Sequence, residues 1–194
     1  MNLILGSNSP RRAALLSQLG YAFEVRVAEI DEEAFEYINP KDAPIFLAQK
    51  KAEALIPQGK ENEVLLCADT LVFLDQQVLG KPKNLGDAKA LLHTLSGKTH
   101  EVITGVYLYT DHSTCSFAVT THVTFDALSE KDIDHYVNHY PVLDKAGSYG
   151  IQDWIGLIGV SNIEGSYTNV MGLPTLETYH HLEKIMKKGA DGPL

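Results

Sequence analysis

The fold class of this chain is decided by the stretch Leu3-Ile4-Leu5-Gly6-Ser7-Asn8-Ser9-Pro10-Arg11-Arg12. Its first three residues are an apolar run that predicts a short buried strand, and the polar loop Gly6-Ser7-Asn8 ends that strand. Ser9 is typical of an N-cap and Pro10 of a first helical position, so a helix is expected to begin there and to end at Gly20. The chain therefore opens with a strand, a short loop and a helix.

Helical and strand patterns then mix along the chain without strict alternation. Further helices are predicted at 44–55, 86–95, 129–139 and 175–187. Strands are predicted at 23–27, 64–74 (interrupted at Asp69-Thr70), 75–81, 101–109, 116–125, 155–158 and 160–163. Two stretches have the pattern of antiparallel hairpins, which favours a mixed sheet over a doubly wound parallel one. We predict a single α/β domain over residues 1–188, with a mixed, elongated sheet and flanking helices, and a frayed tail at 189–194.

Length, charge and cysteine usage exclude several classes of protein. A chain of 194 residues with 44% apolar residues forms one or at most two domains with a real core, which excludes a disordered or coiled-coil chain. The net charge of −9 argues against binding to a nucleic acid polymer. No apolar run approaches the length of a membrane helix, and the amino terminus lacks a signal-peptide core. Because Cys67 and Cys115 are far apart, we expect two free thiols, a reducing compartment and a soluble cytoplasmic protein without membrane contacts.

Some apparent motifs do not carry the chemistry that they suggest. The segment Gly97-Lys98-Thr99 lacks the earlier glycine of a P-loop, because Leu92 occupies that position, so it is interpreted as a helix end. His135 and His139 have the i, i+4 spacing of a zinc pair, but the intervening residues lack the glutamate of a zinc protease. Surface or half-buried histidines are the more ordinary interpretation. The GxSxG and GxGxxG patterns of serine hydrolases and Rossmann dehydrogenases are absent.

The loop before the first helix has the features of a phosphate site. A helix amino terminus that follows a strand offers free backbone N–H groups and a positive dipole end. Arg11 and Arg12 add bidentate donors that match phosphate oxygens, although cations at this position oppose the helix dipole. An ordinary capped helix with surface arginines explains the segment equally well.

Charged residues elsewhere could complete such a site. Asp69 lies within the apolar run at 64–74, where a carboxylate costs free energy unless it is paired or binds a metal, so it is either a general base or metal ligand or a cap on local backbone. The basic pairs in Lys50-Lys51 and Lys81-Pro82-Lys83 either join the phosphate site or are solvated. The acidic run Asp31-Glu32-Glu33 either supplies a metal ligand or is a solvated loop.

Taken together, these segments resemble the Maf family of nucleotide pyrophosphatases. The resemblance extends from residue 3 to about residue 182 and is carried by the order and spacing of several short segments. These are residues 7–12, 30–32, 51–52, 68–70, 80–82, 96–100, 144–152 and 163–174.

The resemblance implies an α/β fold like that of inosine triphosphate pyrophosphatases, with a cleft between two lobes, in a homodimer. It implies hydrolysis of a nucleoside triphosphate to the monophosphate and pyrophosphate, with a divalent cation, Mg²⁺ or Mn²⁺. The family's proton acceptor corresponds to Asp69, and its metal residues to Glu32 and Asp69. Its phosphate-binding residues correspond to Ser7, Arg11, Arg12, Lys51 and Lys81.

Three positions distinguish subtypes within the family. Arg11, Thr70 and Gln152 resemble the type that hydrolyses dTTP and UTP, whereas the 7-methyl-GTP type tends to carry Trp, Gln and Glu at these positions. We therefore expect canonical or modified pyrimidine nucleotides as substrates. Cys67 departs from the family, which usually has Gly before Ala-Asp-Thr. The alternatives are a 7-methyl-GTP pyrophosphatase and a nucleotide-binding regulator of septum formation without significant turnover.

Overall fold

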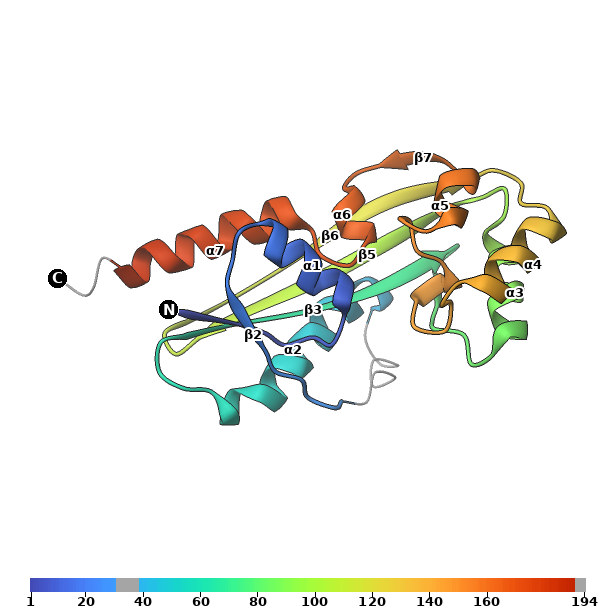
Figure 1. Ribbon diagram of the computed structural model, residues 1–194. Helices are drawn as coiled ribbons and strands as arrows, with labels where there is room; N and C mark the ends of the chain where they lie inside the picture. Colours follow the sequence, from blue (N-terminus) through green and yellow to red (C-terminus); the bar gives the residue numbers. More distant parts are fainter. Residues whose placement is uncertain (31–38, 191–194) are drawn as a thin grey trace. The chain divides into compact units, whose positions relative to one another are not determined.

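The computed structural model describes residues 1–30 and 39–190 (Figure 1). The strands within these residues are β1 (Asn2–Leu5), β2 (Phe23–Val25), β3 (Glu63–Leu74), β4 (Gln77–Leu79), β5 (Thr99–Thr110), β6 (Ser113–Phe125) and β7 (Val160–Glu164). The α-helices within them are α1 (Pro10–Gln18), α2 (Ala43–Leu55), α3 (Leu85–Leu95), α4 (Glu130–His139), α5 (Trp154–Gly159), α6 (Tyr167–Val170) and α7 (Thr175–Ala190). The described strands form one sheet in the order β2-β1-β3-β5-β6-β7, and β4 pairs with β3. Because the sheet contains both parallel and antiparallel pairs, the predicted mixed α/β class is confirmed.

The chain divides into two compact units. The first unit consists of Met1–Asp69, Thr104–Val119 and Gly172–Leu194, and the second unit consists of Thr70–Ile103 and Thr120–Met171. The cleft between two lobes and the single domain over residues 1–188 stay predictions. Within the described residues, none of the helices has the length and apolar content needed to cross a membrane.

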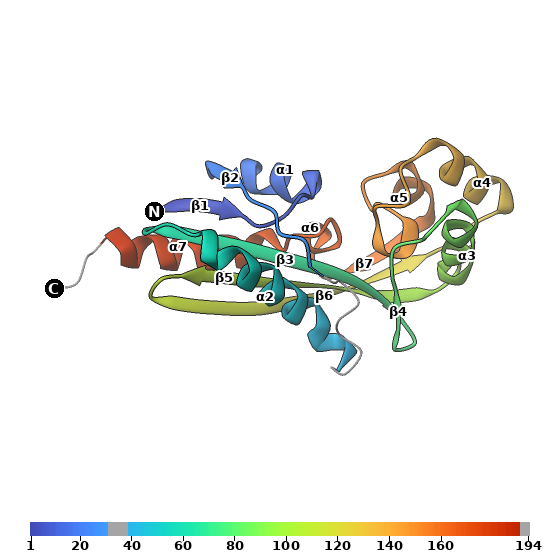
Figure 2. The same cartoon turned by 90° about the horizontal axis from the view of Figure 1, so that it is seen from below.

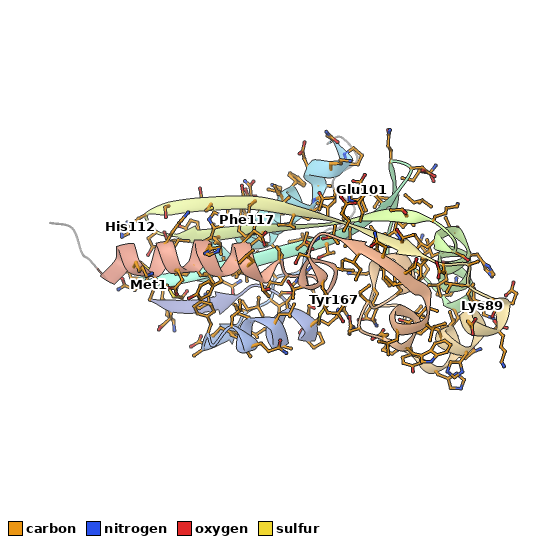
Figure 3. All side chains as sticks on the ribbon, turned by 90° about the horizontal axis from the view of Figure 1, so that it is seen from above. Met1, Lys89, Glu101, His112, Phe117 and Tyr167 are labelled. Atoms are coloured by element: carbon orange, nitrogen blue, oxygen red, sulfur yellow. The ribbon has the colours of Figure 1, made fainter. Side chains whose placement is uncertain are left out.

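The first unit is built around parallel strands. Leu3 of β1 is paired with Phe23 of β2 on one side and with Val64 of β3 on the other, both in parallel register. Parallel neighbours require crossover connections, and α1 and α2 lie within the segments that make them. Figures 2 and 3, which view the molecule from below and from above, show α2 on one face of these strands and α7 on the other. A Cβ at Gly105 of β5 would lie 2.3 Å from the backbone nitrogen of Ile45, so α2 packs directly on this strand.

Each face of this part of the sheet has its own set of contacts. On the α2 face, apolar side chains from β1 and β3 form a cluster with those of the helix: Ile4, Ala52, Leu55, Leu65 and Cys67. On the α7 face, the ring of Phe117 in β6 stacks on His181 at a centroid distance of 4.6 Å (Figure 3). The strands of the first unit are therefore covered by helices on both faces.

The second unit contains the larger apolar cluster. The strand pair β3–β4 is an antiparallel hairpin whose turn residues Asp75 and Gln76 both have positive φ, as a type I′ turn requires. The cluster is formed by apolar side chains of the strands and of α3, α4 and α5, among them Leu92, Phe125 and Tyr136. Apolar burial on this scale holds α3 and α4 against the strands.

Several local predictions are confirmed. The hairpin predicted around residue 112 is formed by β5 and β6. Ser129 is the N-cap of α4, with its Oγ accepting from the backbone N–H of Asp132 at 3.2 Å. Gly97 follows α3 with φ +71°, which is the left-handed conformation of a helix stop.

Two local predictions are wrong. The strand β3 continues through Asp69 and Thr70 without interruption, because the ladder of backbone hydrogen bonds tolerates a carboxylate whose charge is paired. The segment 155–158 is not a strand but lies within α5. Ile155 is buried whereas Leu157 and Ile158 are exposed, and a short apolar run of this kind cannot be assigned by periodicity alone.

Candidate active site

The loop between β1 and α1 is ordered by its own hydrogen bonds. The backbone N–H of Gly6 donates to the carbonyl of Leu66 at 2.7 Å, which fixes the start of the loop on β3. Ser9 Oγ accepts from the backbone N–H of Arg12 at 3.4 Å, so the predicted N-cap of α1 is confirmed. Ser7 Oγ accepts from the backbone N–H of Ser9 at 3.2 Å. The first turn of α1 and the serine loop therefore form one local structure.

Arg12 is not a surface arginine. Its side chain donates from NH1 to Ser7 Oγ at 3.0 Å and from Nε to the carbonyl of Gly172 at 2.8 Å, and the residue is 9% exposed. Arg11, one position earlier, is half-buried. A buried guanidinium at a helix amino terminus adds to the positive potential of the helix dipole instead of compensating it. This arrangement concentrates positive charge at the start of α1, which suits an anionic ligand.

Asp69 is paired with a lysine from α2. Lys51 Nζ donates a hydrogen bond to Asp69 Oδ1, and the side chains are 13% and 10% exposed. The two residues are separated by 18 positions and come from different elements, so the contact is a product of the fold. The pair explains how an apolar strand accommodates the carboxylate, since a buried charge is tolerated when it is paired.

Cys67 is a buried residue of β3, two positions before Asp69. Burial raises the pKa of the Cys67 thiol to about 12, and the nearby cations of Lys51 and Arg12 act in the opposite direction without overcoming it. The residue therefore stays a neutral thiol at physiological pH and is not a nucleophile. The sulfur also fills the space beside Gly6, where an added Cβ would lie 2.2 Å from Cys67 Sγ.

The structure thus brings together four of the predicted residues in the first unit. Ser7 and Arg12 share a hydrogen bond, Lys51 and Asp69 share another, and both cations act on the thiol of Cys67. The backbone bond from Gly6 to Leu66 and the close approach of Gly6 to Cys67 Sγ place the start of the β1–α1 loop beside β3, two positions before Asp69.

The other predicted residues belong to the second unit. Thr70 follows Asp69 in β3 and is half-buried, Lys81 is exposed after β4, and Gln152 is half-buried. The carbonyl of Gly80 accepts from the backbone N–H of Gly147 at 3.1 Å. This bond places the segment that contains Lys81 beside the glycine-rich segment that leads to Gln152.

Polar residues to which the sequence assigned no role form a network around Asp153, the neighbour of Gln152 in the chain. Lys145 is 4% exposed, and its Nζ lies 2.9 Å from Asp144 Oδ1 and 3.7 Å from Asp153 Oδ2. The hydroxyl of Tyr136 donates to Asp153 Oδ2 at 2.7 Å. The available signal was the pair Asp144-Lys145 at the start of a glycine-rich segment, but nothing local indicates that this lysine is buried.

The two histidines with zinc-like spacing pack against each other. The rings of His135 and His139 stack at a centroid distance of 4.5 Å, and a ring nitrogen of His139 donates to the carbonyl of His135 at 2.8 Å. Among the described residues, these two histidines belong to no group of three His, Cys, Asp or Glu side chains that could hold a metal ion, so the stacking on α4 is a sufficient account of the pair.

Comparison with known proteins identifies the family. The model of the Maf-like protein family matches residues 2–185. This chain belongs to the Maf family. Proteins named dTTP/UTP pyrophosphatase are among its relatives: one from Phocaeicola vulgatus is 49% identical over 94% of this chain and 95% of its own. Another from Parabacteroides distasonis is 46% identical over 93% and 94%, and one from Flavobacterium psychrophilum is 48% identical over 93% and 92%.

Part of the chain is similar to a solved structure. A nucleoside-triphosphatase / dITP/XTP pyrophosphatase from Mycobacterium abscessus superposes with a TM-score of 0.42 at 14% identity, over 66% of this chain and 76% of that one.

In this Maf protein, the described residues supply one of the two predicted carboxylates for a divalent cation. Glu32, one of the two predicted metal ligands, lies outside the described residues. Among residues 1–30 and 39–190, no three His, Cys, Asp or Glu side chains form a cluster that could hold a metal ion by themselves. Asp69 supplies one carboxylate. Mg²⁺ is often held by one or two carboxylates together with substrate phosphates, so the residues present fit that mode of binding.

The first unit also has a pocket that contains none of the predicted site residues. It has a volume of about 540 Å³ and is lined by residues at the start of β3 and around the β5–β6 turn, among them Arg26, Glu63, Tyr109 and His112. Arg26 donates to both carboxylate oxygens of Glu63 at 2.9 Å, and this pairing lowers the pKa of Glu63 to about 2. Within this pocket, the charges of Arg26 and Glu63 therefore compensate each other.

Proposed function

We propose that this protein hydrolyses dTTP and UTP, or modified forms of these nucleotides, to the monophosphate and pyrophosphate. The single observation that carries the proposal is the Asp69–Lys51 pair on β3, the strand to which the loop before the arginine-bearing start of α1 is hydrogen-bonded. A carboxylate of low exposure held beside a cation suits water attack on a phosphoanhydride, which needs a proton acceptor and cations that neutralise the phosphate charge. The identity to relatives named dTTP/UTP pyrophosphatase supports the choice of substrate.

The phosphate-binding part of the proposal rests on cations and backbone donors. The start of α1 offers its N–H groups and helix dipole to phosphate oxygens, together with Ser7, Arg11 and Arg12. Lys51 is placed by α2 to exchange its contact with Asp69 for one with a phosphate oxygen. Lys81, which is exposed, adds a further cation for the triphosphate.

Asp69 is the proposed general base. Water attacks a phosphorus of the phosphoanhydride, the bond to the bridging oxygen breaks, pyrophosphate leaves, and the proton of the attacking water passes to the Asp69 carboxylate. A divalent cation, Mg²⁺ or Mn²⁺, bound by Asp69 and Glu32 would lower the pKa of that water and neutralise charge on the leaving group. The protein's own contribution is to hold the carboxylate beside Lys51 and to exclude bulk water from it.

Base recognition is proposed for Arg11, Thr70 and Gln152. An amide side chain such as Gln152 offers one donor and one acceptor, which matches the O4 and N3–H groups of uracil and thymine. A base that lacks the matching groups leaves buried polar atoms unpaired, and that cost is the source of specificity.

The remaining parts of the proposal concern the state of the protein in the cell. We expect a homodimer, which light scattering at micromolar concentration tests directly. We expect a cytoplasmic location, since Cys67 and Cys115 are free thiols. We also expect the two units to belong to one domain over residues 1–188, which a single cooperative unfolding transition would support.

The proposed function is tested by pyrophosphate release from a nucleotide panel in the presence of Mg²⁺ or Mn²⁺. The panel contains UTP, dTTP, CTP, ATP, GTP and 7-methyl-GTP, and the variant Asp69→Asn is assayed beside the wild type. Asp134→Asn is a matched control, because Asp134 forms an exposed ion pair with Lys89 (Lys89 is labelled in Figure 3).

Each outcome of this assay decides between named alternatives. Preference for UTP and dTTP, lost in Asp69→Asn and kept in Asp134→Asn, supports the proposal. Preference for 7-methyl-GTP assigns the protein to the other subtype. Binding of nucleotides without pyrophosphate release supports a regulator without turnover.

A further inference from the structure

The amide of Gln152 has a fixed orientation. Its Nε2 donates to Asp153 Oδ1 at 3.1 Å. Its Oε1 is buried and accepts no hydrogen bond from the described residues. A buried acceptor without a donor costs free energy, and in native proteins such an atom calls for an explanation by a water, an ion or a ligand. The residue as a whole is half-buried, so its side chain lies at the border between the interior and solvent.

The carboxylate of Asp153 is itself held by two residues. Its Oδ2 accepts from the hydroxyl of Tyr136 at 2.7 Å, and Lys145 Nζ lies 3.7 Å from the same oxygen. Tyr136 is fully buried, and its hydroxyl accepts from the backbone N–H of Gly150 at 3.1 Å. The Asp153 carboxylate therefore has a fixed position in the second unit, and it determines where the amide of Gln152 lies.

Gly150 leaves the space that this arrangement needs. A Cβ at Gly150 would lie 2.5 Å from Asp153 Oδ2 and 2.8 Å from Gln152 Nε2. The carboxylate and the amide both rest against the bare backbone of this glycine. Any side chain at this position would displace them together.

The carboxylate of Asp153 allows only one orientation of the Gln152 amide. An ionised carboxylate only accepts hydrogen bonds, so Asp153 attracts the NH₂ end of the Gln152 amide and repels the carbonyl end. We propose that Asp153 is a positioning residue for base specificity, which orients Gln152 so that Oε1 accepts from a ring N–H of the bound base. This inference rests on the proposed function and deepens it. The matching donor is the N3–H of uracil or thymine, whereas cytosine presents an unprotonated N3 at that place.

The test is the ratio of kcat/KM for UTP to kcat/KM for CTP, measured in a double-mutant cycle of Asp153→Ala and Gln152→Ala. One net hydrogen bond corresponds to roughly a twofold to twelvefold change in such a ratio. We expect Asp153→Ala to lower the ratio by about this amount, mainly through a higher KM for UTP. The double variant should show no larger loss than Gln152→Ala alone, because Asp153 acts through Gln152. The matched control Asp134→Ala, which breaks an exposed ion pair in the same unit, should keep the wild-type ratio.

A second variant guards against a folding defect in Asp153→Ala. Asp153→Asn keeps the shape of the side chain, and its amide accepts or donates, so both orientations of Gln152 become possible. Its ratio should fall by about twofold. A wild-type ratio in Asp153→Asn and Asp153→Ala, or independent losses that multiply in the double variant, would overturn the positioning role while leaving the proposed function intact. If the wild-type enzyme prefers 7-methyl-GTP to UTP in the nucleotide assay, that result overturns the proposed function and this inference with it.

Discussion

Lys51 of α2 donates a hydrogen bond to Asp69 of β3, and both side chains are largely withdrawn from solvent. Removing either charge leaves the other uncompensated, but Asp69→Asn keeps the shape of the side chain and an acceptor for the Lys51 ammonium, whereas Lys51→Met leaves the carboxylate without a donor from α2. We therefore expect Lys51→Met to lower the free energy of unfolding by about 3 kcal/mol, and Asp69→Asn to lower it much less. Urea unfolding of both variants measures the difference.

Asp69→Asn is also expected to lose catalytic activity. Asp69→Asn should lose at least about 100-fold in kcat, since general-base catalysis contributes roughly 10²–10⁴-fold. A loss below about tenfold would remove Asp69 from the role of general base. Asp134→Asn, with its exposed ion pair, serves as the control for both measurements.

Gly6 and Cys67 should be coupled through space. A Cβ at Gly6 would lie 2.2 Å from Cys67 Sγ and 3.0 Å from Leu55 Cδ1, so Gly6→Ala should cost about 1–3 kcal/mol through overpacking. Cys67→Ala removes the sulfur and should relieve most of that cost in the double variant. We expect a coupling free energy of about 1 kcal/mol or more in a thermal or urea unfolding cycle. Strictly additive costs would show that the sulfur is not what excludes a side chain from position 6.

The parts of the site that the sequence predicted are those whose contacts are local. Ser9 and Pro10 determine the start of α1 through an N-cap bond to a residue three positions away. The α5 segment was assigned to the wrong element because a short apolar run satisfies both periodicities, and only its surroundings select the helix.

Contacts between distant segments left no such pattern. The bond from Arg12 to the carbonyl of Gly172 spans 160 positions. The Tyr136–Asp153 bond spans 17 positions and joins residues with no role in the predicted site. The family resemblance assigned both Lys51 and Asp69 to the site. Neither periodicity nor composition indicates that these two side chains form an ion pair.

His100 should make stability depend on pH. Burial lowers the pKa of its imidazole from 6.5 to about 4, and its Nε2 shares a hydrogen bond of 2.6 Å with the hydroxyl of Tyr149. Above pH 6.5 the folded and unfolded states are both neutral at this residue. Between pH 6.5 and about 4 only the unfolded state binds the proton. The free energy of unfolding therefore decreases as the pH is lowered through this range, by up to about 1.4 kcal/mol per pH unit.

His100→Gln should remove this part of the slope, because glutamine keeps a hydrogen-bonding group that does not titrate. The measurement is the free energy of unfolding in urea at several pH values between 7 and 4. His122→Gln is the matched control, since His122 is exposed on β6 of the same unit. Equal slopes in wild type and His100→Gln would contradict the prediction.

Arg12 and Lys81 should differ in what their loss affects. Lys81 is exposed, so Lys81→Ala should raise KM for UTP several-fold with an unchanged Tm. Arg12 is buried and donates to Ser7 and Gly172, so Arg12→Ala should lower both kcat/KM and Tm. The two quantities are measured on the same preparations. A Lys81→Ala variant with the wild-type KM would show that Lys81 is a solvated surface residue that does not bind the triphosphate.

Replacing Arg11, Thr70 and Gln152 together by Trp, Gln and Glu should move preference from UTP towards 7-methyl-GTP. Trp at position 11 can stack on the cationic methylated ring, and a carboxylate at position 152 can accept from purine N–H groups. We expect the ratio of kcat/KM for the two nucleotides to change by at least about tenfold.

Asp153 determines how well this exchange works. A Glu at position 152 would stand where the Gln152 amide now lies, with Nε2 3.1 Å from Asp153 Oδ1, and two carboxylates at that separation repel each other. Adding Asp153→Asn to the triple variant supplies a donor for the new carboxylate and should increase the shift further. The comparison requires the triple and quadruple variants, assayed with UTP and 7-methyl-GTP under the same metal concentration. If both variants keep the wild-type ratio, these positions do not recognise the base, and if the triple and quadruple variants shift it equally, the repulsion from Asp153 is too weak to matter.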